Sequence, residues 1–271
     1  MAITTSDGLV AAIATAQREP LFKAQTAAEG AGTLLTYLWA AGRPGAITTP
    51  SPGVNGEAVS SSMSGFIPYI NAGVGNQKYL ASVEGVLGVT GSVIFADMLW
   101  WNSGINVTTT TEQTISAATA SARDVNGSSN GAGVEAGILV STATTNGSAV
   151  TNTTFKYTNS AGATGKVGAI PSFPQTCVAG TLVPFTLAAG DTGVRAIESV
   201  TLGTSYGGGA IHLVLFRRLT ILPIPVAFIG SQRNFFDIGT KVYDNSAIFP
   251  MTLCTSATAG QFLGQITFIE G

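Results

Sequence analysis

The clearest pattern along the chain is a pair of neighbouring apolar segments near its C-terminal third. Residues 210–216 are apolar or β-branched apart from His212, and so short a run is typical of a strand buried on both faces. Residues 194–202 mix apolar with charged positions, which indicates a half-exposed strand. The glycines at 207–209 tolerate the positive φ of a tight reversal. The pattern therefore predicts a β-hairpin at the centre of a β-sandwich.

Further short strands are predicted before this hairpin, separated by Gly and Asn turns. Residues 134–140 alternate apolar positions with positions that face the other way. In residues 151–158, Phe155 and Tyr157 share one face and Lys156 lies on the other. The remaining predicted strands are 105–115, 164–170 and 182–187. This spacing indicates an antiparallel β-sandwich of the jelly-roll or immunoglobulin-like kind.

Helical spacing occurs only towards the N-terminus. Ser6 and Asp7 can cap a short helix whose apolar face consists of Leu9, Val10, Ile13 and Ala16. A second apolar group has the same spacing, at Leu34, Leu35, Leu38 and Trp39. Amphipathic spacing fits packing on the protein's own sheet as well as an arm that engages a neighbouring subunit.

Proline-rich stretches divide the chain into three expected parts. Residues 47–58 have the composition of an extended linker. Pro223 and Pro225 cannot donate ladder hydrogen bonds, so residues 219–227 should leave the sheet or form its edge. We expect an N-terminal helical segment or arm at 1–45, a β-sandwich domain at 46–227, and a C-terminal extension at 228–271 with a terminal strand at 261–269. The two ends should carry the main subunit contacts.

Composition points to a protein that works within an assembly. Charged residues make up only 10% of the chain, against about 25% in ordinary domains. Solubility then depends on hydroxyl and amide groups, or neighbouring subunits cover much of the surface. The net charge is −2 without a basic run, which argues against direct nucleic-acid binding.

The sequence shows no targeting or membrane signal. The first twenty residues lack a basic n-region, and the apolar window 83–101 contains Glu84 and Asp97. Cys177 and Cys254 lie too far apart in sequence to form a disulfide framework. We therefore expect a protein that is made in the host cytoplasm, stays soluble there and has no membrane partner.

The short motifs do not support an active site. His212 is the only histidine and lies in the predicted buried strand, so we interpret it as a core residue. Asp191-Thr192-Gly193 matches the tripeptide of aspartic proteases, but a single copy and a turn-like context favour a turn. The glycines at 207–209 lack the Lys-Ser/Thr of a phosphate loop. We expect no enzyme activity, no catalytic residue, no metal and no cofactor.

The aromatic pair Trp100-Trp101 is open to two interpretations. In a sandwich such a pair belongs to the core more often than to the surface, whereas an exposed pair would mark an interface or a sugar-stacking platform. The candidate interface residues are Leu34, Leu35, Leu38, Trp39, Trp100, Trp101, Phe235, Phe236 and Phe262.

Several stretches spread over most of the chain carry a resemblance to a known family. They are LWAAGRPG at 38–45, MLWWNSGI at 98–105 with the threonine run 108–111, AGDTGV at 189–194, IESVTL at 197–202, and LFRRL at 215–219 with PIP at 223–225. In these stretches the chain resembles virion structural proteins of tailed bacteriophages. None of the stretches is a catalytic signature.

The resemblance implies a virion as the setting. Sandwich proteins of this size in virions resemble capsid decoration, or cement, proteins, which clamp neighbouring major capsid subunits. We expect a homo-oligomeric structural protein on the capsid exterior, with the major capsid protein or other virion proteins and further copies of itself as partners. The alternatives are a neck, tail or baseplate component, and a glycan-binding adhesion module that uses Trp100 and Trp101.

Overall fold

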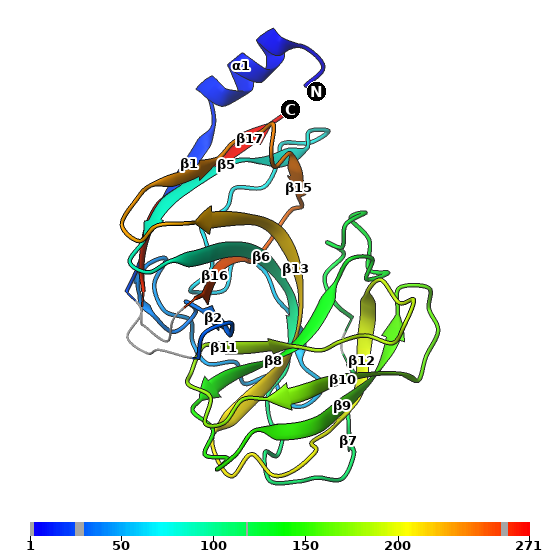
Figure 1. Ribbon diagram of the computed structural model, residues 1–271. Coiled ribbons are helices and arrows are strands. Elements are labelled where there is room, and N and C mark those ends of the chain that lie inside the picture. Colours follow the sequence, from blue (N-terminus) through cyan, green and yellow to red (C-terminus); the bar gives the residue numbers. More distant parts are fainter. Residues whose placement is uncertain (1–2, 25–29, 118, 256–259) are drawn as a thin grey trace.

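The computed structural model describes residues 3–24, 30–117, 119–255 and 260–271, which form three antiparallel sheets and one helix (Figure 1). The predicted mainly β, antiparallel fold class is confirmed, and so is a short N-terminal helix, α1 (Ser6–Ala14). The cap of α1 lies one residue before the predicted one, because the Thr5 hydroxyl accepts from the Gly8 amide at 3.0 Å. Among the described residues there is no helix long and apolar enough to cross a membrane.

Six strands form a closed sheet in the middle of the molecule. In order around the ring, the strands are β13 (Ala210–Ile224), β8 (Glu135–Thr142), β11 (Thr181–Pro184), β2 (Leu34–Thr36), β16 (Ile248–Cys254) and β6 (Gly91–Trp101). The ring closes because β6 also pairs with β13. Strand β4 (Glu57–Ala58) adds to the end of β6. All six ring strands contribute to one apolar cluster, so this cluster is the interior of the closed sheet.

A second sheet, which we call the terminal sheet because it contains the first and the last strand of the chain, packs on one side of the ring. Its order is β14 (Ser231–Arg233), β5 (Lys78–Leu87), β17 (Gln261–Glu270), β1 (Gln17–Ala24) and β3 (Ala41–Arg43), with β15 (Thr240–Val242) also paired to β5. The core between the two contains Leu80, Val83 and Phe262 from the terminal sheet and Phe95 and Leu222 from the ring. The predicted last strand, 261–269, therefore completes the chain's own sheet.

The third sheet, the distal sheet, packs against another side of the ring. Its order is β10 (Lys166–Phe173), β9 (Val150–Asn159), β12 (Val194–Thr201) and β7 (Gln113–Thr114). Phe155 and Tyr157 of β9 meet Ile138 and Leu213 of the ring in its core, while Lys156 is exposed, as the alternation predicted. In Figure 1 the terminal sheet, the ring and the distal sheet follow one another from top to bottom.

Strands β6 and β13 contribute to all three cores because bulges turn their faces. The β6–β13 register shifts between Leu215 and Phe216 and again between Arg218 and Thr220. On β6, Phe95 faces the terminal sheet, Trp101 the ring interior and Trp100 the distal sheet. A bulge inserts one unpaired residue and re-aims the side chains that follow it. This antiparallel pair is the element that all three cores share.

The predicted hairpin is wrong in its pairing, although both of its strands exist. Strand β12 pairs with β7 and β9 of the distal sheet, whereas β13 pairs with β6 and β8 of the ring. The glycine-rich connection crosses between layers because buried Tyr206 anchors it, donating its amide to the Val107 carbonyl at 2.8 Å. Periodicity reports which faces are buried and does not report the layer to which a strand belongs.

Two predicted elements differ in kind. The apolar group at 34–39 is strand β2 and a turn, not a helix, because β2 pairs with β11 and β16, and Leu34 and Leu38 fill the ring interior. Of the predicted strand 105–115 only Gln113–Thr114 pairs, since most of that stretch is loop. The edge predicted from Pro223 is confirmed, because the part of β13 after Phe216 pairs with β6 alone among the described strands.

The boundaries expected near residues 45 and 228 do not separate structural units. Strand β1 pairs with β17, which pairs with β5, and β2 lies between β11 and β16. Segments from all three expected parts thus share sheets and cores. The physical reason is that every strand of a closed sheet is paired on both sides. Strand β2, from the first expected part, therefore has to lie between β11 and β16.

Deleting residues 1–45 should therefore yield a chain that does not fold, because the deletion opens the ring at β2 and removes β1 from the terminal sheet. Far-UV circular dichroism and thermal unfolding test this. Deletion of residues 1–14 is the matched control: it removes only α1, of which Ala12 alone is buried, and should leave a cooperative transition. Cooperative unfolding of the 46–271 chain would contradict the ring as an obligatory unit.

Candidate interaction surface

Most of the candidate interface residues belong to the chain's own cores. Leu34, Leu35, Leu38, Trp100, Trp101 and Phe262 are all buried. These six assignments are corrected, because a side chain packed inside a closed sheet or between two sheets has no surface to offer a partner. Trp39 is half-buried and donates to the Thr49 hydroxyl at 3.3 Å, and Phe235 is half-buried. Only Phe236, at 87% exposure, remains fully accessible.

The tryptophan pair is not a glycan platform. Trp100 is 0% and Trp101 4% exposed, and they point to opposite faces of β6 as neighbours in a strand must. Trp101 packs against Phe66 with ring centroids 5.7 Å apart and donates to the Glu57 carboxylate at 2.9 Å. The adhesion hypothesis is thereby overturned, since stacking on a sugar needs an exposed ring face.

The residues singled out for possible catalysis have structural partners. His212 is buried between the Asn102 carbonyl, 2.6 Å from Nδ1, and the Ser141 hydroxyl, 2.7 Å from Nε2, and burial lowers its pKa. Asp191 accepts from the Tyr157 hydroxyl at 2.6 Å and from the Asn159 amide at 2.7 Å. These bonds hold its loop on β9 and lower the pKa of its carboxyl group. Within the described ranges no three His, Cys, Asp or Glu side chains gather as a metal site would require.

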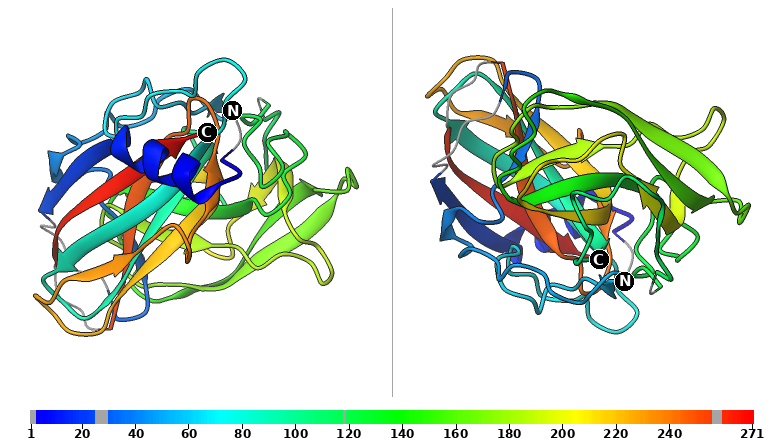
Figure 2. Two further views of the ribbon diagram at one scale, coloured as in Figure 1. Left: turned by 90° about the horizontal axis from the view of Figure 1, so that it is seen from above. Right: turned by 90° about the horizontal axis from the view of Figure 1, so that it is seen from below.

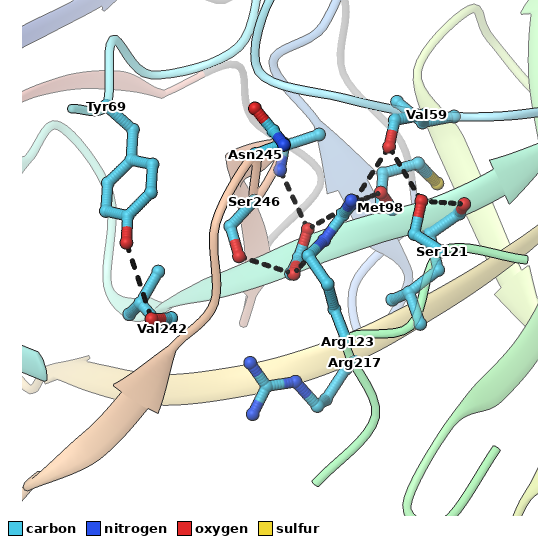
Figure 3. A network of polar contacts seen from close by, with 12 residues as sticks. Val59, Tyr69, Met98, Ser121, Arg123, Arg217, Val242, Asn245 and Ser246 are labelled. Carbon is cyan, nitrogen blue, oxygen red and sulfur yellow. Dashed lines mark hydrogen bonds and ion pairs between the residues drawn. The ribbon is translucent and has the colours of Figure 1, made fainter. Parts of the chain in front are cut away.

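A buried polar network joins three distant segments at the middle of β6 (Figure 3). Arg123 binds Asp97 through two hydrogen bonds of 3.0 Å, a bidentate pair that is almost completely inaccessible to solvent. The same guanidinium donates to the carbonyls of Val59 at 2.9 Å and Met98 at 2.8 Å. Ser246 donates its hydroxyl to the Asp97 carboxylate at 2.8 Å.

The network is a structural clamp rather than a reactive site. The Ala247 amide also donates to Asp97 at 2.8 Å, so the carboxylate is satisfied on every side. Arg217 lies opposite Asp97 in the β6–β13 register, and its Cζ lies 5.2 Å from the centre of the Tyr243 ring. Burial lowers the pKa of Arg217, and the Asp97 charge opposes that shift. Asp97, one of only two charged residues in the apolar run 83–101, was the signal that could have revealed this clamp.

The accessible apolar surface lies on the outer face of the terminal sheet. Val86 on β5, Leu263 on β17 and Phe22 on β1 stand directly opposite one another and form what we call the apolar row. Leu263 is 51% and Phe22 41% exposed. Phe228 extends the row, since its ring lies over Gly88 at the end of β5. Single exposed apolar residues need no explanation, whereas a contiguous row of them is a candidate interaction surface.

Helix α1 covers the other end of this face. Seen from above, it lies across the strands near one end of the sheet (Figure 2). Ala12 of α1 packs on Ala81 and Ile269, whereas Val10 points away and is exposed. Between α1 and the chain after β14 lies a groove of about 390 Å³, which we call the α1 groove. Its walls include Leu9, Ile13, Phe235 and Phe236, and its floor Gln265 and Thr267.

No family model and no curated protein matches this chain. Among solved structures, it is weakly similar to the infectious bursal disease virus VP2 subviral particle, at 9% identity over 94% of this chain and 80% of that chain, with a TM-score of 0.18. The structure of the infectious bursal disease virus Gt strain gives 11% identity over 94% of this chain and 80% of that chain, with a TM-score of 0.17. Similarities of this size carry no argument about what the chain does.

Asp97→Asn should destabilise the fold by about 3–5 kcal/mol, because it leaves the Arg123 charge buried without its counter-ion. Urea unfolding at neutral pH measures the change. Glu135→Gln is the matched control: it breaks the Arg218–Glu135 pair, which has a similar distance of 2.8 Å but is about one-third exposed on both sides. The control should cost less than about 1 kcal/mol. Equal losses for both variants would contradict the clamp.

A buried lysine gives the fold a pH dependence. The Lys23 ammonium donates to the carbonyls of Ala40 at 3.2 Å and Gly45 at 3.1 Å, and none of the ion pairs among the described residues includes it. Burial lowers its pKa from 10.5 to about 8. As pH rises, the folded protein therefore loses this proton before the unfolded chain does.

The free energy of unfolding should thus rise between about pH 8 and 10.5, where the folded protein has released the Lys23 proton and the unfolded chain still holds it. The complete effect of Lys23 is of the order of 3 kcal/mol, from about 2.5 pKa units. Urea unfolding across this range in Lys23→Met should lose the rise, and the exposed control Lys241→Met should keep it. The same slope in Lys23→Met and wild type would show that another group titrates.

Proposed function

We propose that this protein is a non-enzymatic structural subunit of a tailed-phage virion, which decorates the capsid exterior and stabilises it by bridging major capsid subunits. The observation that carries the proposal is the apolar row beside the α1 groove, an open apolar face on a chain with only 10% charged residues. Such a face promotes aggregation of a free monomer, whereas in a subunit that binds its neighbours it supplies the buried apolar contact.

The virion setting comes from the resemblance of the sequence to tailed-phage virion proteins. The structure contributes the physical means of stabilisation. Each 100 Å² of apolar surface that the protein covers adds about 2.5 kcal/mol of association energy before the costs of association. Repeated over a shell under internal pressure, modest contacts of this kind accumulate.

The proposed partners are the major capsid protein, or other virion proteins, and further copies of the chain. The proposed location is the virion, reached after synthesis in the host cytoplasm. Direct contact with nucleic acid is not part of the proposal, because the net charge is −2 and the sequence contains no basic run.

Particles that lack this protein should burst at a lower temperature or a milder osmotic shock than complete particles. Dye access to the packaged genome during a temperature ramp measures the burst. Adding the purified protein back should restore the complete-particle value, and adding Asp97→Asn protein, which destabilises the subunit, should restore it less well. Equal burst temperatures with and without the protein would overturn the capsid-stabilising function.

Copy number separates the head from the neck, tail or baseplate. Quantitative mass spectrometry of purified particles should find hundreds of copies per virion if the protein decorates the head. A small multiple of six or twelve would move it to the tail apparatus and contradict the capsid assignment. Absence from particles would overturn the virion setting altogether.

A further inference from the structure

The two ends of the ring differ. At the end where β6 finishes and β16 begins, the Val59 amide donates to the Leu99 carbonyl at 3.1 Å and the Ile67 amide to the Ile248 carbonyl at 2.8 Å. The loop that makes these bonds also places Val59 and Phe66 in the apolar cluster of the ring interior, so it closes this end. At the opposite end, where β6 begins and β16 finishes, lies a cavity of about 340 Å³, which we call the ring mouth.

The floor of the ring mouth is the ring interior itself. Leu34 of β2, Ile94 of β6 and Leu182 of β11 line the cavity, and all three belong to the apolar cluster of the ring. Alternate residues of a strand share a face, so Pro184 follows Leu182 towards the rim. Leu253 of β16, which is 37% exposed, also lines the mouth. The mouth of a closed sheet is a common place for a small ligand.

Arg218 of β13 is the one charged residue among the described residues that line the ring mouth. It lies two positions after Phe216, which fills the ring interior, so the guanidinium stands above an apolar floor. Arg218 pairs with the Glu135 carboxylate at 2.8 Å, and both side chains are about one-third exposed. An exposed pair of this kind contributes little, and a guanidinium has five N–H donors. Arg218 can therefore bind a second carboxylate.

An uncharged hollow continues the ring mouth. It has a volume of about 570 Å³ and shares Gly32 and Leu253 with the mouth. Pro223 and Pro225 of the β13 edge also line it, and none of its described lining residues is charged. A ligand held at Arg218 can therefore extend an apolar chain over Leu253 without meeting a second charge.

We propose that the ring mouth binds an apolar anion, a molecule with an alkyl chain and one terminal carboxylate. The chain covers the floor formed by Leu34, Ile94 and Leu182, and the carboxylate pairs with Arg218 at the rim. This inference goes beyond the proposed function and does not depend on it, since the site lies within one chain.

The lining selects this class of ligand. Thr33 and Arg218 are the only polar side chains among the described residues that line the ring mouth. A sugar or a nucleotide would leave several of its polar groups buried without hydrogen bonds there. An organic cation would meet Arg218 as a like charge. An alkyl carboxylate gains affinity from each methylene that leaves water and is oriented by the guanidinium.

The first experiment is isothermal titration calorimetry of the full chain with decanoate, below the concentration at which decanoate forms micelles. One site per chain should bind it with a Kd between about 10 μM and 1 mM, as expected for a ligand of this size. From octanoate to decanoate to dodecanoate, each added methylene should strengthen binding by about twofold to fourfold. Decyltrimethylammonium, with the same chain and the opposite charge, should bind at least about tenfold more weakly than decanoate.

The absence of saturable binding by all three carboxylates at millimolar concentration would overturn the proposal. So would equal affinity for decanoate and decyltrimethylammonium, because the site would then not recognise the anion.

The second experiment tests the rim, where two substitutions should move the decanoate affinity in opposite directions. Arg218→Gln removes the cation and should weaken binding at least about tenfold. Glu135→Gln removes the competing carboxylate and should strengthen binding by about twofold to fivefold. The matched control is Arg43→Gln, which breaks another exposed pair, with Glu19 at 3.5 Å, away from the mouth and should leave the affinity unchanged. Shifts of the same sign in Arg218→Gln and Glu135→Gln would contradict the assignment of Arg218.

The third experiment locates the alkyl chain. Leu253→Ser should weaken decanoate binding at least about fivefold, because it removes apolar surface from the path of the chain. Leu263→Ser on the outer face of the terminal sheet is the matched control and should bind as wild type does. Circular dichroism must show that each variant is folded. If Leu253→Ser is not, Thr33→Asp replaces it and should weaken binding by placing a competing carboxylate beside Arg218. An equal loss in the Leu263→Ser control, or no loss in a folded mouth variant, would overturn the site.

Discussion

The buried carboxylate of Asp97 is the constraint on which the remaining structure depends. It sits on β6 opposite Arg217, between the two bulges that turn the β6–β13 pair from one core to the next. A buried charge is tolerated only when it is paired and fully hydrogen-bonded, and here Arg123, Ser246 and the Ala247 amide supply those bonds. Asp97 therefore obliges three segments far apart in the sequence to meet at one place.

The closed sheet follows from that meeting. The Arg123 guanidinium also binds the Val59 and Met98 carbonyls, so the loop before β8 is tied to β6, and Ser246 ties the start of β16 to its other side. Since β6 also pairs with β13, the ring closes around an apolar interior, and the terminal and distal sheets pack onto its outside. Three cores that share two strands should unfold as one cooperative unit.

Polar and apolar chemistry are distributed in an unusual way in this protein. The Asp97–Arg123 ion pair is buried and fixes the ring, whereas Leu263 and Phe22 are exposed to solvent on the outer face of the terminal sheet. That inversion suits a subunit whose surface is completed by its neighbours.

The sequence by itself determined the class of fold and many of its strands. Alternation around Phe155 and Tyr157, the apolar run at 210–216 and the prolines at 223 and 225 located β9, β13 and a sheet edge, because local periodicity records which faces of a strand are buried.

Tertiary structure alone decided the layers. Strands β12 and β13 look like a hairpin in sequence yet belong to different sheets, since buried Tyr206 carries the chain across. The apolar group at 34–39 has helical spacing, yet Leu34 and Leu38 fill the ring interior. The apolar row could not be found from the sequence for the same reason: Val86, Leu263 and Phe22 come together only through strand register, which long-range pairing sets and local pattern does not.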